Sequence, residues 1–474
     1  MIHIVFVLIL SLLVLLMPNR MEVFNSEFNI LIGLIYTCSL IIFFAFRKRF
    51  DRNWLTFDSL FLIGFTIVHF QIPILAGFGI EPERANYIWI NKEVVNFATW
   101  MSCVCIVLWM WGYLVSLTRV NGKKNYKFSI YNKIDYKKIS FQKYDRVLLI
   151  LFIAFIGLVG GSFFSGVYDG GESWGGGAIY IYLVLKSLLY LRIIYFFKIL
   201  SEKGSKLTIR SIVFSFLKYK FFLFVLVCYF GLFLLSGDRG PILQISLIIG
   251  ASYSIFIHKI SFRKLFLFVF LGAFVFTILK FGRSREINEV KQGNIFERGY
   301  ANYKNNDASV GFTDELAASV RIQYRALDVV PDRHPYLYGL TFVNGVLGAV
   351  PFASSTFMDL LDIPKEYTAT TTFFTYLGQG RNPISGEGSE IIGDIYVNFG
   401  LYISFVIMFL FGSFVGRVYK RALHKDFNSI IVLIILTAIS IYWSRSVLLL
   451  PLKEIVYILV INYIFTIKAR KKIH

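Results

Sequence analysis

The sequence predicts an all-α polytopic membrane protein with about twelve transmembrane helices and one large extracytoplasmic helical loop. Composition gives the first reason, because 56% of the 474 residues are hydrophobic and only 16% are charged, against roughly 25% charged residues in soluble domains. The apolar residues also come in long blocks separated by short loops. One connection, residues 283–389, is far longer than an ordinary loop, and such long loops are usually functional.

Twelve apolar segments approach the length of about 20 residues that a helix needs to cross a bilayer. They are residues 2–17, 28–46, 55–78, 94–118, 147–165, 178–199, 219–236, 241–258, 264–282, 390–416, 428–447 and 451–468. The first segment is short, but it lacks a basic n-region and a cleavage site, so we expect a retained helix. The chain thus divides into nine spans within 1–282, a cap loop at 283–389, and three spans with a basic tail within 390–474.

The charges of the loops predict the orientation of the chain. The net charge of +20 is concentrated in alternate loops and in the tail, at residues 47–52, 119–146, 203–210, 259–264, 417–425 and 468–472. The positive-inside rule places these segments and both termini in the cytoplasm, and the acidic or neutral loops on the other side. The chain has no nucleic-acid-binding motif and no dense basic arm, so membrane lipid is an expected partner and nucleic acid is not.

Several kinds of enzyme site are disfavoured by the sequence. The cysteines, Cys38, Cys103, Cys105 and Cys228, all lie inside apolar runs and show neither zinc-ligand spacing nor a disulfide framework. The predicted outer face carries no Walker A, GxSxG, HExxH or Asp-x-Asp metal motif. ATP-driven transport, serine hydrolysis and zinc proteolysis therefore lose support.

The long loop has its own structural pattern. Residues 317–327 show helical spacing, and a proline-rich turn follows at 331–335. The apolar stretch 340–352 is too short to span a bilayer, so we expect it to lie in the membrane interface. The sequence therefore predicts that the loop folds as a cap over the outer face.

Arginines end three apolar runs on this predicted outer face. Arg239, beside Asp238, joins two spans, Arg283 and Arg285 follow the ninth span, and Arg445 lies between the last two. Arginine is costly in a bilayer, so its repetition at one face indicates an anionic ligand, and guanidinium groups bond phosphate oxygens in pairs. The alternatives are a tight turn with an Arg–Asp pair and the anchoring of helix ends at the lipid head groups.

Carboxylates precede and begin the tenth span. If this segment is helical, Glu390 and Asp394 are four residues apart and share a face, and Glu387 lies on the preceding loop. Each of the three is a candidate general base for an acceptor hydroxyl, and ion pairing with the arginines is the alternative role. His334, in the long loop, is another candidate base or a solvated side chain.

Other polar side chains are weaker candidates. Arg381 and Tyr396 are candidate substrate contacts, together with His334 and Asp238. Lys186 and Arg192 lie inside the sixth span, where a cation is either functional or snorkels toward the head groups.

This layout and several short motifs resemble the O-antigen and capsule polymerases of the Wzy type, also called oligosaccharide repeat unit polymerases. The layout covers the whole chain, and the motifs cover its second half: Ser236-Gly237-Asp238-Arg239-Gly240-Pro241, Tyr338-Gly339, Val350-Pro351, Gly388-Ser389-Glu390 and Tyr396-Val397-Asn398-Phe399-Gly400. The resemblance implies a GT-C-like helical fold in a bacterial inner membrane, with the active site on the periplasmic face. It also implies transfer of a glycan from undecaprenyl diphosphate to the non-reducing end of a new lipid-linked repeat unit, without a metal or cofactor.

The resemblance assigns roles to the candidate residues. The four outer arginines would bind the lipid diphosphate, and Glu390, Asp394 or Glu387 would act on the acceptor. Expected partners are undecaprenyl-diphosphate-linked oligosaccharides, a repeat-unit flippase and a chain-length regulator. An O-antigen ligase, with the same donor and another acceptor, and a lipid-linked oligosaccharide flippase are the alternatives. The sequence shows no internal repeat of the kind common in transporters.

Overall fold

The computed structural model describes residues 2–82, 84–118, 141–159, 163, 177–202, 209–236, 238–281, 297, 299–302 and 313–467. These residues form helices and connecting turns, and no β-strand occurs among them. The chain divides into two compact units, each described by itself: unit 1 is Met1–Arg52, Phe57–Lys123 and Thr313–Lys453, and unit 2 is Asn53–Thr56, Lys124–Phe312 and Glu454–His474.

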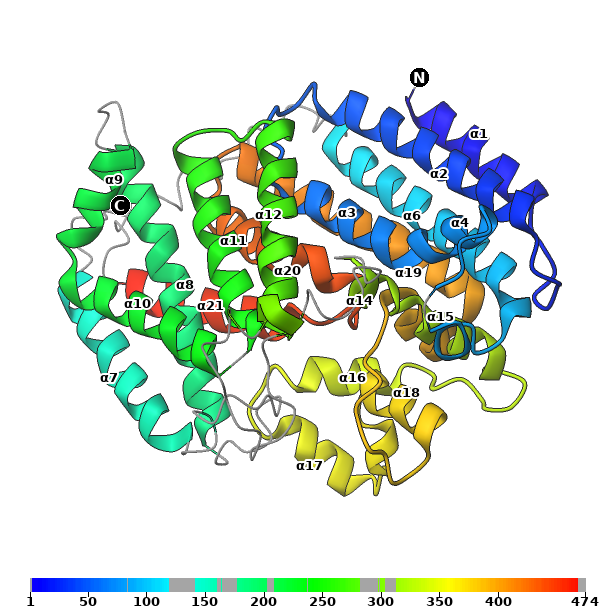
Figure 1. Ribbon diagram of the computed structural model, residues 1–474. Helices are drawn as coiled ribbons and strands as arrows, with labels where there is room; N and C mark the ends of the chain where they lie inside the picture. Colours follow the sequence, from blue (N-terminus) through cyan, green and yellow to red (C-terminus); the bar gives the residue numbers. More distant parts are fainter. Residues whose placement is uncertain are drawn as a thin grey trace, which may run out of the picture. The chain divides into compact units, whose positions relative to one another are not determined.

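Unit 1 combines the beginning of the chain with a segment near its end (Figure 1). Its helices before the division are α1 (Ile2–Leu15), α2 (Ser26–Arg47), α3 (Phe57–His69), α4 (Gln71–Gly77), α5 (Ala85–Ile88), η1 (Lys92–Val94) and α6 (Val95–Thr118). Those after it are α14 (Asp314–Ala317), α15 (Val320–Val329), α16 (Leu340–Leu347), α17 (Ala353–Leu360), η5 (Lys365–Tyr367), α18 (Thr370–Gln379), α19 (Ile391–Leu423) and α20 (Phe427–Trp443).

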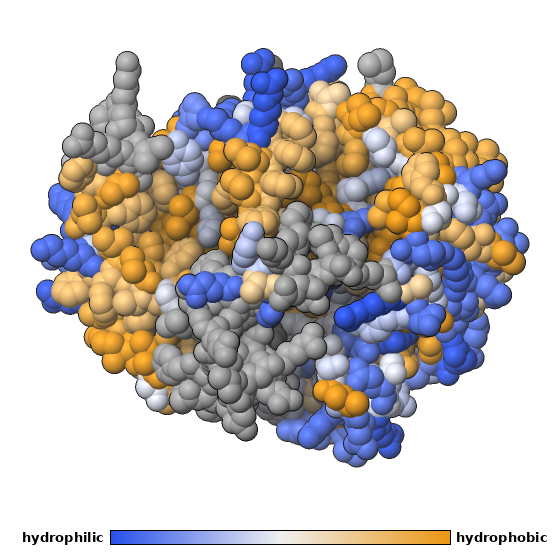
Figure 2. Space-filling model, in the orientation of Figure 1, coloured by the Kyte–Doolittle hydropathy of each residue, from blue (hydrophilic) through white to orange (hydrophobic). Residues whose placement is uncertain are grey.

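Unit 2 contains the middle of the chain and most of the last helix. Its helices are α7 (Phe141–Val159), α8 (Ala178–Glu202), α9 (Ile209–Leu217), α10 (Lys220–Leu235), α11 (Arg239–Phe256), α12 (Phe262–Phe281) and α21 (Leu452–Thr466). Helix α9 falls in a segment that the sequence pattern assigned to a basic loop. Figure 2 shows hydrophobic surface over α12, and the exposed phenylalanines of this helix include Phe266, Phe270 and Phe274.

Each of the twelve predicted spans corresponds to helical structure, and this confirms the all-α prediction for the described part of the chain. The segment predicted as one span at 55–78 is two helices, α3 and α4, bent by 47°. Among the described residues, three stretches are long and apolar enough to cross a membrane: Ser26–Arg47, Lys92–Thr118 and Ile391–Leu423, with the bent pair as a fourth. A polytopic helical membrane protein fits these findings, while the number of twelve spans and the GT-C-like arrangement stay predictions.

The core of unit 1 is the contact between α6 and α19, which run side by side in Figure 1. Gly112, Gly412 and Gly416 make this contact close, because a Cβ atom at each would overlap a carbonyl oxygen of the facing helix. Gly412 and Gly416 are four residues apart and so lie on one face of α19. Small residues at this spacing are typical of helix pairs in membranes, where close backbone packing replaces the hydrophobic effect between helices.

Helix α19 is broken at Gly400, whose φ of 76° and ψ of −175° are not helical. The Val397 carbonyl accepts a hydrogen bond from the backbone N–H of Leu337, 2.8 Å away, so the loop segment supports the break. A Cβ atom at Gly400 would lie 3.3 Å from the Tyr336 ring. The break separates 391–399 from 401–423, and the second part alone has the length of a membrane span.

The described part of the long loop is folded, as predicted. Helical spacing at 317–327 corresponds to α14 and α15, and the apolar stretch from 340 begins with α16. The carbonyls at the C-terminal end of α15 are held by Arg20, which donates to the Val330 oxygen at 2.6 Å and pairs with Asp332 at 3.1 Å. The loop is therefore bonded to the connection between α1 and α2 of unit 1.

Three basic side chains that the sequence placed in a loop or inside a span form buried ion pairs. Arg47, assigned to a basic loop, is 2.8 Å from Asp58, and both side chains are almost fully buried. In unit 2, Arg192 lies 2.7 Å from Asp145 and is fully buried, so the snorkelling alternative is wrong. Lys186 contacts Glu454. Burial of each charge beside an opposite charge removes the need to reach the head groups.

Candidate functional site

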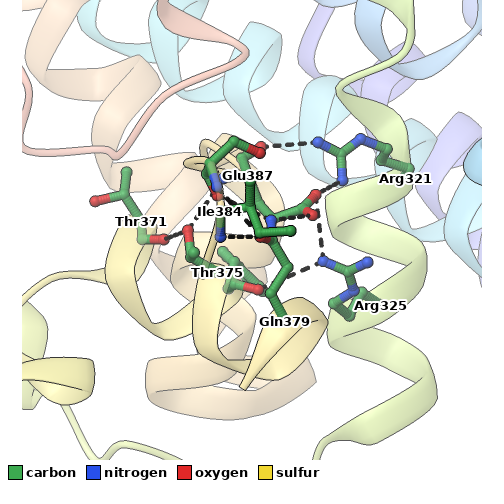
Figure 3. A network of polar contacts seen from close by, with 9 residues as sticks. Arg321, Arg325, Thr371, Thr375, Gln379, Ile384 and Glu387 are labelled. Atoms are coloured by element: carbon green, nitrogen blue, oxygen red, sulfur yellow. Dashed lines mark hydrogen bonds and ion pairs between the residues drawn. The ribbon is translucent and has the colours of Figure 1, made fainter. Parts of the chain in front are cut away.

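Two arginines of α15 and one glutamate form a group of largely buried charges in unit 1. Arg321 and Arg325 are four residues apart and share one face of this helix, whereas Gln323 lies two residues from each and points the other way. Both arginines converge on Glu387, from the loop before α19 (Figure 3). We refer to Arg321, Arg325 and Glu387 as the arginine–glutamate cluster.

The cluster is tightly bonded. One guanidinium nitrogen of Arg321 contacts the Glu387 carboxylate, and the other donates to the Glu387 backbone oxygen at 3.0 Å. Arg325 Nη1 lies 3.4 Å from Glu387 Oε2, and Gln379 Nε2 donates to Oε1 at 2.8 Å. The side chains of Arg321, Glu387 and Arg325 are 7%, 9% and 13% exposed, so solvent reaches only their edges.

Two guanidinium groups against one carboxylate leave a surplus of one positive charge at this position. Burial is the largest single influence on the pKa of Glu387 and raises it. Hydrogen bonds from Gln379 and Arg321, with the charges of Arg321 and Arg325, together outweigh burial and hold the pKa below its ordinary value. Burial also lowers the pKa of Arg325, because it disfavours the charged form, and the positive charge of Arg321 lowers it further against the opposing effect of Glu387. The cluster is therefore suited to attract an anion.

Local sequence explains how the arginines reach this geometry. Gly378, in α18, leaves the space that the Arg325 guanidinium occupies, because a Cβ atom at Gly378 would lie 2.7 Å from Arg325 Cζ. Arg321 Cζ lies 4.2 Å from the centre of the Tyr87 ring, a cation–π contact. The Glu387 N–H donates to Thr375 Oγ1 at 3.0 Å and fixes the loop to α18.

Glu390 lies on the opposite side of α15 from the cluster and begins α19. Its backbone is extended (φ −147°, ψ 143°), and its carboxylate accepts hydrogen bonds from the backbone N–H groups of Ile392 and Gly393, at 2.5 Å and 2.6 Å. An acidic N-cap is favourable because it satisfies free N–H groups and faces the positive end of the helix dipole. Glu390 is therefore the N-cap of α19, and its backbone oxygen accepts the first helical hydrogen bond, from the Asp394 N–H at 2.8 Å, while its carboxylate turns back to cap the first turn.

A closed polar network surrounds Glu390. His69 Nε2 is 3.1 Å from Glu390 Oε1, and both side chains are fully buried. The other ring nitrogen of His69 is 3.3 Å from Gln323 Oε1, to which Ser102 also donates at 3.0 Å. This network connects α3, α6 and α15 to the start of α19.

Asp394 is also buried and bonded. Thr370 Oγ1 donates to Asp394 Oδ1 at 2.5 Å, and the Leu448 N–H donates to Oδ2 at 2.8 Å. Glu390 and Asp394 thus hold protein groups in place, and of the three predicted carboxylates only Glu387 contacts the partly exposed arginines.

The remaining candidates in unit 1 lie apart from the cluster or face other partners. Arg445 is 3.6 Å from Glu315, with both side chains partly exposed. Arg381 is 77% exposed and lies 3.3 Å from Glu366. His334 bonds to its neighbours: Nδ1 is 2.7 Å from the Pro335 oxygen and Nε2 is 3.2 Å from the Tyr367 hydroxyl. The Tyr396 hydroxyl donates to the Val330 oxygen at 2.9 Å.

The other predicted anion ligands belong to unit 2 or lie outside the described residues. Asp238 is the N-cap of α11 and accepts from the Gly240 N–H at 3.0 Å, and Arg239 is the first residue of that helix. Arg283 and Arg285 lie outside the described residues. The alternative role of Asp238, as the partner of an arginine in a tight turn, stays a prediction.

Sequence reasoning missed Arg321 and Arg325 as site residues. The available signal was their spacing of four within a stretch already predicted to be helical, in a loop that the topology placed outside. Their convergence on Glu387 depends on how α15 packs against α18 and α19, which the spacing does not specify. The described residues contain no group of three or more acidic, cysteine or histidine side chains that could hold a metal ion.

Comparison with known proteins adds no family. No protein-family model, no curated protein and no solved structure matches the chain.

Proposed function

We propose that this protein is a membrane glycosyltransferase that polymerises lipid-linked oligosaccharide repeat units, in O-antigen or capsule biosynthesis. The observation that carries the proposal is the arginine–glutamate cluster, a partly exposed site with surplus positive charge in the same unit as the candidate membrane spans. The resemblance to Wzy-type polymerases supports the same class of donor, a glycan on undecaprenyl diphosphate.

The chemistry requires stabilisation of a leaving diphosphate. In the transfer, the acceptor oxygen bonds to the anomeric carbon, the bond from that carbon to the diphosphate breaks, and its electron pair stays on the diphosphate. Arg321 and Arg325 would neutralise this charge through paired N–H bonds to phosphate oxygens, a role that metal ions play in other phosphate-binding enzymes. Arg239, Arg283, Arg285 and Arg445 stay the diphosphate ligands that the sequence predicts, and the assay below tests them separately from the cluster.

Glu387 connects the two halves of this reaction. While the arginines contact it, its lowered pKa makes it a weak base. A diphosphate that takes over the hydrogen bonds of Arg321 and Arg325 would free the carboxylate, and its pKa would return toward the ordinary value because its stabilising partners are gone. The arriving donor would thereby prepare Glu387 to receive the proton of the acceptor hydroxyl. Glu390 and Asp394 remain alternative bases.

Purified protein in detergent, supplied with an undecaprenyl-diphosphate-linked repeat unit, tests the proposal. We expect a ladder of longer lipid-linked glycans on a gel, formed without an ion gradient. Arg321→Ala and Arg325→Ala should each slow its formation by about 100-fold or more, while the matched surface variant Arg333→Ala, whose side chain is 61% exposed, keeps the rate. Undiminished ladders in both cluster variants would contradict the assignment of the arginines.

The same assay separates the alternatives. Transfer to a lipid A acceptor without chain growth would identify an O-antigen ligase, and translocation of the lipid-linked unit without any new glycosidic bond would identify a flippase. The same measurement decides which of the arginines predicted from sequence take part in glycosyl transfer. The variants are Arg239→Ala, Arg283→Ala and Arg445→Ala. A repeat-unit flippase and a chain-length regulator are the partners that this function implies.

A further inference from the structure

Helices α16 and α17 form a short hairpin, and polar side chains of α16 hold its inner side. Thr341, on α16, donates to Asn398 Oδ1 at 2.9 Å and lies 2.9 Å from Thr370 Oγ1. Asn344, one helical turn later, accepts from Ser354 Oγ of α17 at 2.5 Å and donates to the Thr368 oxygen. The side of the hairpin that faces the rest of unit 1 is therefore held by hydrogen bonds.

The opposite side of the hairpin is apolar and exposed. Val343, Val346 and Val350 recur at intervals of three and four residues, so they lie on one side of α16 and its extension. Further large apolar side chains are exposed at the two ends of α17: Phe352 before it, Leu360 as its last residue, and Leu361 after it.

The distribution of polar and apolar side chains on α16 is the reverse of that on a helix at a water-exposed surface. A surface helix of a soluble protein turns its apolar stripe inward and its polar side chains outward. On α16, Thr341 and Asn344 face inward while Val343 and Val346 face outward, so the medium on this side of α16 is expected to be apolar. Helix α17 buries Met358 and exposes Thr356 and Asp359 beside Leu360, a mixed surface that suits the boundary between lipid and water. Each helix has only eight residues, about 12 Å at 1.5 Å per residue, and is far too short to span a bilayer.

The hairpin adjoins a candidate membrane span. The Phe342 ring lies 4.9 Å from the Phe399 ring of α19, just before the break at Gly400. Beyond the break, α19 continues with an exposed apolar stripe that comprises Tyr402, Ile403, Val406, Leu410 and Phe414. The hairpin therefore contacts α19 just before the segment that carries this exposed apolar stripe.

We propose that the α16–α17 hairpin lies in the boundary layer of the membrane, with Val343, Val346 and Leu360 in contact with lipid acyl chains. The occupant of this surface is lipid, because α16 contacts a candidate span next to its exposed apolar stripe and turns its valines away from the polar packing of unit 1. The proposal is independent of glycosyl transfer and concerns only what covers this surface.

Spin labels test this contact in the full-length protein. Single cysteines are introduced at Val346 and, as the matched control, at Ile384, which is 98% exposed on the turn after α18. Both are made in a Cys38→Ser, Cys228→Ser background, because these two native cysteines are not buried. The labelled proteins are placed in phosphatidylcholine vesicles, and collisions with oxygen and with a water-soluble nickel chelate are measured.

We expect the Val346 label to collide with oxygen and to be shielded from nickel, with an oxygen-to-nickel ratio several-fold above that at Ile384. A Leu360→Cys label should repeat the result from the other helix of the hairpin. Equal nickel access at Val346 and Ile384 would overturn the proposal. So would shielding from both reagents with spin–spin broadening that dilution by unlabelled protein removes, because a second copy of the chain would then cover the surface.

Discussion

Glu387 is held by Arg321, Arg325 and Gln379, and its pKa is lowered although burial alone would raise it. A carboxylate with a lowered pKa stabilises the fold only while it is ionised. That contribution is fully present above the pKa of the unfolded chain, about 4.3 for glutamate, and is lost as the pH falls through the lower folded pKa.

This linkage gives a pH-dependent prediction for Glu387→Gln. The amide keeps the shape of the side chain and loses its charge, so two guanidinium groups remain without a counter-ion, at a cost of about 1–3 kcal/mol. Thermal unfolding in detergent should show a lower Tm for the variant at pH 7, with a difference from wild type that narrows below about pH 4.3. A difference that stays constant down to pH 3 would show that charge is not the cause.

Gly378 gives a second test at the scale of a residue. Alanine there would overlap the Arg325 guanidinium, a flexible group that can move, so we expect the Arg325–Glu387 contact to be lost while the fold remains. In the polymerisation assay, the rate of the Gly378→Ala variant should fall toward that of Arg325→Ala. Gly386→Ala is the control, because a Cβ atom at Gly386 meets no atom within 4 Å. Equal rates for the two glycine variants would show that the position of Arg325 does not matter.

At the scale of helices, the contact between α6 and α19 depends on glycine. Gly412→Leu adds a side chain where even a Cβ atom overlaps the Trp109 carbonyl oxygen, and backbone cannot give way as cheaply as a side chain. Overpacking of this kind costs about 1–3 kcal/mol, so we expect a clearly lower Tm in detergent. Gly157→Leu on α7, where a Cβ atom meets nothing within 4 Å, should change the Tm little. Equal decreases of the Tm in Gly412→Leu and Gly157→Leu would contradict the role of the α6–α19 contact.

The helices themselves were largely predictable from sequence because long apolar runs specify them. The bend between α3 and α4 is not predictable from the apolar pattern, because the break after His69 falls inside one continuous apolar run. Glu390 was recognised as a special carboxylate, but its role as an N-cap depends on the extended backbone of one residue, which spacing alone does not reveal. The pairing of Arg321 with Glu387 joins residues 66 positions apart and follows from tertiary packing.

At the scale of the whole molecule, neither compact unit is one continuous stretch of the chain. Unit 1 draws its helices from both sides of the long middle segment that forms most of unit 2. Loop charge is a local property, so it could predict which segments are exposed but not which helices pack together. Of the arginines that the sequence grouped at one face, Arg445 belongs to unit 1 and Arg239 to unit 2, while Arg283 and Arg285 lie outside the described residues. Their common face stays a prediction.

Only two residues, Gly388 and Ser389, separate the carboxylate that contacts Arg321 from the one that caps α19. Helix α15 lies between these two attachments, with Arg321 bonded to Glu387 and Gln323 bonded to the His69 ring beside Glu390. A tether this short cannot absorb a large displacement. We therefore expect a ligand that displaces Glu387 from the arginines also to shift the residues that begin α19, the longest candidate span.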